Sequence, residues 1–236
     1  MSENLPEKVG GTNGADVTAI AVKGALGAIP FAGNLLAEIA GNLIPGQRLD
    51  RLIKFAEALE ARLQETEKKL FEARAKTEEG ADLVEDALTQ AARSLTDDRR
   101  ARIAELLKNG LTAEEFDHDG TKKLLWLLDQ ITDPELVWLV FIGRDYDQTM
   151  MKKHSDVLEG RVSHTGSPEQ EHDAAALQAS WRRRLLDLGL VRTAKFSGGG
   201  VDLALTGLEN ADEDGSLNLT QLGSMLMRSM GEEPQW

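Results

Sequence analysis

The sequence contains no cysteine, which excludes disulfide bridges, thiolate metal sites and a cysteine nucleophile. Aromatic residues make up only 5% of the chain, so most of its hydrophobic 41% is aliphatic. Positive charge is also scarce, because 27 lysines and arginines stand against 40 aspartates and glutamates, a formal net charge of −13. An acidic surface repels phosphate groups, which disfavours general binding to nucleic acid or anionic lipid.

The N-terminus lacks the cationic start and adjoining apolar run that are typical of a signal peptide. Residues 1–14 are polar and rich in turn-forming residues, so we expect a flexible tail. We therefore expect a cytoplasmic protein, with association to the inner membrane left open by the segment that follows. No cofactor is expected.

The longest apolar stretch, residues 17–44, carries only two charges, Lys23 and Glu38. About 20 apolar residues are enough for one membrane span, so a span is one interpretation. Charges within such a segment are costly in lipid, which favours a hairpin buried in a water-soluble core. The stretch is rich in glycine and alanine, which allow helix backbones to approach closely.

Pro30 argues against one straight helix in this stretch, because proline breaks the helical hydrogen-bond ladder. We expect two short helices, over 16–28 and 32–43, hinged at Ile29-Pro30. A membrane or a protein partner would then contact the larger apolar residues of the hairpin. These candidate binding residues are Ile29, Phe31, Leu35, Leu36 and Ile39.

Apolar residues next recur in steps of three and four, which predicts one amphipathic helix over 48–79, ended by Gly80. We favour packing of its apolar seam inside the same chain over pairing with another chain. Gly24, Gly27 and Gly33 are expected where this helix passes close to the hairpin.

The middle of the chain is also helical in pattern, and we assign residues 15–160 to one helical domain. Thr96 precedes two aspartates, which predicts an N-cap. An apolar helix is expected over 121–131, around Trp126. Residues 135–143 are apolar on every side, which predicts a central buried helix.

The C-terminal part, residues 167–231, differs because strand patterns follow a helix. Residues 190–196 and 201–208 are expected to form a hairpin, followed by a short strand at 217–220 and a last helix. This order is similar to the end of a winged-helix domain. The predicted fold class is therefore mainly α, a helical bundle with a small C-terminal winged-helix-like α+β unit.

Residues 210–221 place oxygen-bearing side chains at the spacing of an EF-hand calcium loop, with candidate ligands Asp212, Asp214 and Asn218. The final ligand position holds the neutral Gln221 in place of a bidentate glutamate, and the preceding segment favours a strand. An acidic turn is therefore favoured over a metal site.

Three consecutive arginines, Arg182, Arg183 and Arg184, lie on a predicted helix beside the hairpin, where a winged-helix protein would contact phosphates. The alternative is a solvated helix face neutralised by nearby acids, and winged-helix folds also serve as protein-interaction modules. The chain contains no phosphate loop, HExxH motif or nucleophile motif with supporting context, so an enzyme is not expected.

The run GALGAIPFAGNLLAEIAGNLIPGQRLDRLIKFAEALEARL resembles the start of small bacterial helical proteins with an apolar G-x-x-P-x-x-G hairpin. LLDLGLV at 185–191 and LTQLGSMLMR at 219–228 resemble the C-terminal motifs of the same proteins. The resemblance implies a bacterial helical protein of unassigned role. In composition alone, the glycine-rich apolar start is also similar to HeLo-type cell-death domains, which act on membranes.

Three functions remain open at this point. The first is a non-enzymatic protein that acts through contacts with a protein partner or a second copy of itself. The second is a membrane-active or membrane-associated protein that uses the hairpin over 17–44. The third is a nucleic-acid-binding regulator that uses the three arginines.

Overall fold

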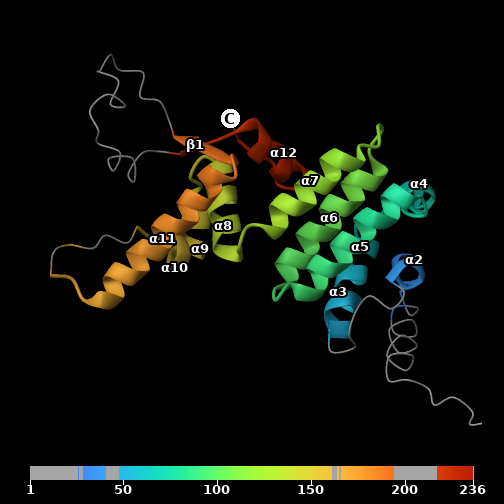
Figure 1. Cartoon of the computed structure of the whole chain (residues 1–236), viewed down its shortest axis with the longest axis horizontal. Coiled ribbons are helices and arrows are strands. Elements are labelled where there is room, and N and C mark those ends of the chain that lie inside the picture. The colour runs from blue at the N-terminus through green and yellow to red at the C-terminus, as the bar shows by residue number, and fades with distance from the viewer. Residues whose placement is uncertain are drawn as a thin grey trace, which may run out of the picture. The chain divides into compact units, whose positions relative to one another are not determined.

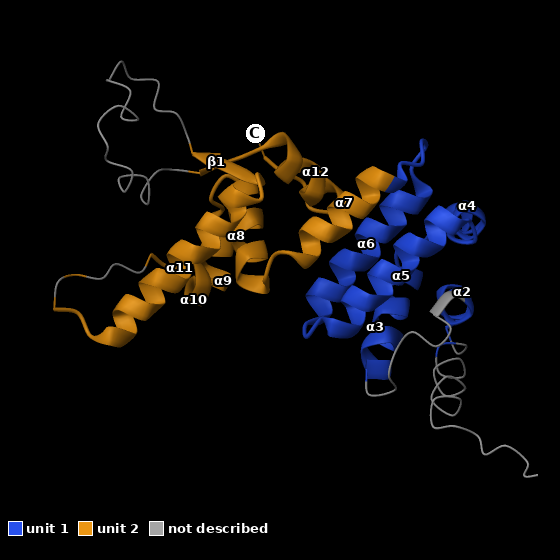
Figure 2. Ribbon diagram, viewed as in Figure 1, with its two compact units in different colours: residues 1–118 blue, residues 119–236 orange. Residues whose placement is uncertain are grey.

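The computed structural model describes residues 26, 29–40, 48–160, 164, 166–193 and 217–235. These residues are mainly helical, with a small two-stranded antiparallel sheet near the C-terminus, so the predicted mainly α class is confirmed (Figure 1). The chain divides into two compact units, residues 1–118 and 119–236, and each is described by itself (Figure 2).

Unit 1 is a bundle of helices. Within the described residues they are α2 (Ala32–Ala40), α3 (Leu49–Glu60), α4 (Glu65–Ala75), α5 (Glu78–Arg93) and α6 (Asp97–Thr112). α3 packs against α2, α5 and α6, and α4 packs against α5 and α6. The side chains buried between these helices are mostly aliphatic, so apolar burial holds the bundle together. Thr96 caps α6 as predicted, since its hydroxyl accepts a hydrogen bond from the N–H of Arg99 at 3.3 Å.

The predicted single helix over 48–79 is wrong, because α3 ends at Glu60 and a separate helix, α4, follows. Gln64 has an extended backbone and starts α4 through a capping box with Glu67, whose carboxylate accepts the Gln64 N–H at 2.8 Å. Leu63 in the intervening turn is buried. The apolar period therefore continues across a break in the helix.

Gly80 lies in the first turn of α5 and does not end a helix, which corrects the sequence prediction. A β-carbon on Gly80 would lie 2.0 Å from the carbonyl oxygen of Arg74 in α4. Glycine is required here because the chain folds back tightly between α4 and α5.

Unit 2 is arranged around α8. The elements after unit 1 are α7 (His118–Asp129), α8 (Asp133–Gly143), α9 (Gln148–Lys153), α10 (Ser155–Leu158), α11 (Glu169–Asp187), β1 (Val191–Thr193), β2 (Leu217–Leu219) and α12 (Gln221–Ser229). As predicted, α8 is buried, and it packs against α10, α11, α12 and β2. These elements all follow α8 in the chain. The two compact units divide after His118, which lies within the range 15–160 that the sequence analysis assigned to one helical domain.

The small sheet pairs β1 with β2 in the register Val191–Leu219, Arg192–Asn218 and Thr193–Leu217. The sequence predicted a hairpin between 190–196 and 201–208, but residues 194–216 lie outside the described part of the chain. Tyr146 joins the sheet to the turn after α8. Its hydroxyl donates to the carbonyl of Leu217 at 2.7 Å and accepts the N–H of the same residue at 2.8 Å.

α2 begins at Ala32 as predicted, directly after a turn that contains Pro30. A β-carbon on Gly33 would lie 1.9 Å from the carbonyl oxygen of Leu26. The predicted reason for this glycine is therefore wrong, because its close neighbour is the preceding turn and not α3. The other predictions for this segment lie outside the described residues: Gly24, Gly27, and the first hairpin helix apart from Leu26.

Candidate functional site

A carboxylate at the end of α3 holds the described part of the apolar segment in unit 1. Glu60 accepts a hydrogen bond from the backbone N–H of Ala32 at 2.7 Å through Oε2 and pairs with Lys68 at 2.9 Å through Oε1. Lys68 also pairs with Glu65 at 2.7 Å, and its ammonium lies 5.6 Å from the centre of the Phe31 ring. The first N–H groups of a helix lack intrahelical acceptors, so Glu60 supplies one to α2. We call Ala32, Glu60 and Lys68 the α2 clasp.

The contacts of the α2 clasp favour the charged form of both side chains. Burial by itself would raise the pKa of Glu60, but hydrogen bonds from Ala32 and Lys68 outweigh burial and lower this pKa. Hydrogen bonds to Glu65 and Glu60 raise the pKa of Lys68. The clasp therefore stays charged across neutral pH.

Of the residues predicted to contact a membrane or partner, three belong to the core of unit 1 and a fourth is half-buried. Ile29, Leu35 and Leu36 are buried, and α2 packs against α3 and α5. Phe31 is half-buried and packs edge-to-face on a phenylalanine of α4, with 6.4 Å between ring centroids. The side chain of Ile39 lies outside what the structure describes.

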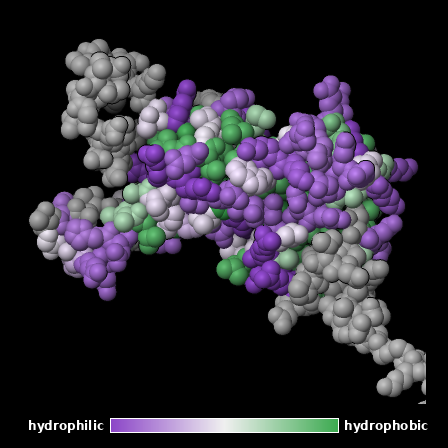
Figure 3. All heavy atoms as spheres, viewed as in Figure 1, coloured by the Kyte–Doolittle hydropathy of each residue, from purple (hydrophilic) through white to green (hydrophobic). Residues whose placement is uncertain are grey.

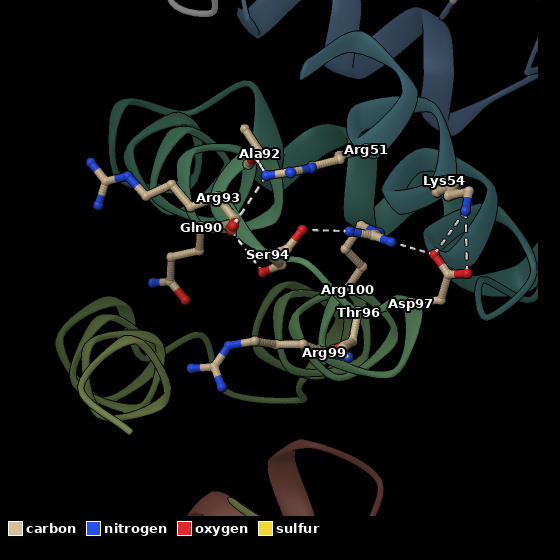
Figure 4. A network of polar contacts seen from close by, with 10 residues as sticks. All are labelled: Arg51, Lys54, Gln90, Ala92, Arg93, Ser94, Thr96, Asp97, Arg99 and Arg100. Atoms are coloured by element: carbon tan, nitrogen blue, oxygen red, sulfur yellow. Dashed lines mark hydrogen bonds and ion pairs between the residues drawn. The ribbon is translucent and has the colours of Figure 1, made fainter. Parts of the chain in front are cut away.

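A second polar cluster fastens the corner between α5 and α6 (Figure 4). Arg100 is buried and donates to the carbonyl of Ser94 at 2.6 Å and to the carboxylate of Asp97. From α3, Lys54 pairs with Asp97 at 3.2 Å, and Arg51 donates to a carbonyl in the last turn of α5 at 3.0 Å. Arg51 and Arg100 donate to carbonyls at the end of α5, where the helix leaves carbonyls without intrahelical donors, so the cluster has a structural role.

α11 has 19 residues, of which only Gln178 and Leu185 are buried. Gln178 donates to the carbonyls of Val157 and Glu159 at 3.0 and 2.9 Å, which fixes α11 to the end of α10. The first turns of α11 extend beyond α8, α9 and α10 in the view of Figure 1. Leu177, one residue before this anchor, is 56% exposed. α11 therefore presents an exposed apolar side chain from a fixed helix.

The three predicted phosphate-binding arginines do not form one patch. Successive residues on a helix point about 100° apart, so their side chains diverge. Arg182 lies over a tryptophan of α8, with its guanidinium 5.8 Å from the ring centre. Arg183 pairs with Asp187 at 3.0 Å, whereas Arg184 donates twice to Gln130, at 3.3 and 3.1 Å.

The candidate calcium loop stays a prediction. Asp212 and Asp214 lie outside the described residues, and Asn218 is an exposed residue of β2. Within the described ranges, no group of three or more histidine, cysteine, aspartate or glutamate side chains is placed to hold a metal ion.

Trp126, at the centre of the apolar helix expected over 121–131, is 44% exposed on α7. The ammonium of Lys123 lies 3.9 Å from the centre of its ring. A lysine three residues before a tryptophan shares its helix face, and this spacing is a sequence signal for an exposed cation–π pair.

Comparison of the chain with protein-family models, with curated proteins and with solved structures finds no match in any of the three. Among the described residues, no helix is both long and apolar enough to cross a membrane.

Proposed function

We propose that this protein acts through protein–protein contacts made by the exposed face of α11 and carries out no chemical reaction. The observation that supports this function best is Leu177, which is 56% exposed on a helix anchored beside it by Gln178. An exposed apolar side chain on a rigid element gains stability when a partner covers it. The anchor reduces the conformational freedom that α11 would lose on binding.

Nucleic-acid binding has weaker support from the same helix. Its first turns carry Glu169, Glu171 and Asp173, all of which are exposed. Acidic side chains there repel phosphates, in addition to the net charge of −13. At the other end of α11, Arg183 is paired with Asp187.

Membrane insertion also has weaker support. Leu35 and Leu36 would have to leave the core of unit 1 before they could enter lipid. Exposure of apolar surface to water costs about 25 cal/mol per Å². Insertion would additionally break the hydrogen bond between Ala32 and Glu60.

Photo-crosslinking in the native host tests the proposed function. A photoreactive leucine analogue is placed at Leu177, and at Leu70 of α4 as the control, since Leu70 is an apolar side chain that is 39% exposed. We expect discrete covalent adducts from position 177 and none of the same mass from position 70. The proposal is wrong if position 177 gives no adduct, or if both positions give the same products.

A further inference from the structure

Acidic side chains predominate in the first turns of α11 and basic ones in its last turns, where the single acid, Asp187, is paired with Arg183. The acidic residues lie in its first two turns and the basic residues in its last two: Glu169, Glu171 and Asp173, then Arg182, Arg183 and Arg184. Leu177 lies between the two groups. Such a helix is complementary in charge to a copy of itself that runs in the opposite direction.

One face of α11 carries members of both groups. Glu169, Asp173, Leu177 and Arg184 are separated by four, four and seven residues, which places them on one side of an α-helix. The first three are exposed, and Arg184 is half-buried. In Figure 3, apolar residues reach the surface where α11 lies.

We propose that a second copy of this chain docks on this face, with the two α11 helices antiparallel and a two-fold axis beside Leu177. The inference rests on the proposed function and names its partner. With the axis there, Arg184 of one copy lies opposite position 170 of the other copy, between Glu169 and Asp173. The same contact forms at the other end, because a two-fold interface uses one surface twice.

The residues around the axis allow close packing. Ala174 and Ser180 lie three residues before and after Leu177. The two-fold axis therefore places Ala174 of one copy opposite Ser180 of the other. Small side chains at these positions permit helix axes to approach to about 8–10 Å. The two Leu177 side chains would then meet at the axis and bury apolar surface. Antiparallel helices also place the positive end of each helix dipole beside the negative end of the other.

The contacts of Arg184 within its own chain leave its charge available to a second copy. Both are hydrogen bonds to oxygens of Gln130, which carries no charge. A uniformly acidic partner would be repelled by Glu169 and Asp173, and a uniformly basic partner by Arg184. A second copy satisfies both ends at once, which is why it fits better than a partner of one charge.

Sedimentation velocity tests this inference. It measures the monomer–dimer equilibrium of the full chain over a range of protein and salt concentrations. The wild type should form a dimer that weakens with salt, since exposed ion pairs are screened. Leu177→Asp places two carboxylates at the axis and should leave only monomer. Leu70→Asp, on α4, should dimerise like the wild type.

A charge series tests the orientation of the helices. Asp173→Lys should weaken the dimer about tenfold or more, because two attractions become repulsions. Glu171→Lys makes the same charge change about 200° around the helix and should have an effect of about twofold or less. A triple variant combines Glu169→Lys, Asp173→Lys and Arg184→Glu. It reverses the sign of every charge in the proposed pairs and should restore dimerisation. Circular dichroism establishes that each variant is folded.

The outcomes separate this inference from the proposed function. A wild-type protein that stays monomeric at low salt overturns the inference, as do equal effects of Asp173→Lys and Glu171→Lys. If position 177 still crosslinks in cells to a different protein, the proposed function stands without the second copy. If position 177 neither crosslinks nor affects association, both are wrong.

Discussion

The backbone nitrogen of Ala32 lies 2.7 Å from Oε2 of Glu60, so a hydrogen bond joins the first residue of α2 to the last residue of α3. Lys68 of α4 completes the α2 clasp from the other oxygen of the same carboxylate. One side chain therefore joins three helices of unit 1. The clasp links the apolar N-terminal segment to the charged helices that follow it.

Glu60→Ala should destabilise unit 1 by about 1 kcal/mol, because the first N–H of α2 loses its acceptor. Hydrogen exchange should also become faster in α2 than in α5 or α6. Glu57→Ala removes an exposed carboxylate from the same helix and serves as the control. The measurements are urea unfolding and hydrogen exchange followed residue by residue. Equal stability and equal exchange in the two variants would contradict the role of the clasp.

The contribution of Glu60 to the free energy of unfolding should decrease at acid pH. Its pKa is lower in the folded chain than its ordinary value of 4.5, so below pH 4.5 the unfolded chain binds more protons. The contribution is fully present above this value and is lost as the pH falls through the lowered pKa. Unfolding free energies of the wild type and Glu60→Ala should therefore differ at about pH 6 and converge as the pH falls below the lowered pKa. A constant difference would show that the carboxylate charge is not involved.

Arg100→Ala should cost about 2–3 kcal/mol, because charge-assisted hydrogen bonds at the buried α5–α6 corner are lost. The carbonyl of Ser94 and the carboxylate of Asp97 both lose a donor. Arg93→Ala removes an exposed arginine at the end of α5 and should cost about 0.5 kcal/mol or less. Thermal melts that rank the two variants in the opposite order would contradict the structural role of the cluster.

Helix identity was predictable where a strong local signal coincides with the final packing. Residues 136–143 are apolar on all sides, so only burial suits them, and Thr96 has the side chain of an N-cap. The break between α3 and α4 was not predictable from such signals. Gln64 is an unusual capping residue, and buried Leu63 keeps the apolar period through the turn.

The site was less predictable than the fold because exposure is set by tertiary packing. Hydrophobicity alone would bury Leu177 and expose Gln178, yet Leu177 is 56% exposed and Gln178 is buried. Gln178 is buried because it donates hydrogen bonds to two carbonyls at the end of α10, and these contacts exist only in the folded chain. The divergence of the three arginines, in contrast, follows from helix geometry alone.

Gly80→Ala should destabilise unit 1 by about 1–3 kcal/mol, because the new methyl group would lie 2.0 Å from a backbone carbonyl of α4. Gly160→Ala is the matched control, since nothing lies within 4 Å of its added β-carbon. Chemical denaturation should separate the two variants. Equal stabilities would mean that the turn between α4 and α5 adjusts without strain.

Leu36→Ala distinguishes a core role for α2 from an insertable one. Leu36 is fully buried, and removal of a buried leucine side chain costs about 2–5 kcal/mol. The melting temperature should therefore fall by at least about 5 °C. Leu70→Ala removes the same atoms from a side chain that is 39% exposed and should have a much smaller effect.

Liposome flotation of the same proteins completes this test. If residues 29–40 act as a core element, wild type and Leu36→Ala should both stay unbound, and only the variant should lose stability. If these residues instead insert into lipid, the wild type should float and Leu36→Ala should bind less while its melting temperature is unchanged. The second pattern would replace the core role with the membrane hypothesis, because a side chain that is not packed in the free protein cannot stabilise it.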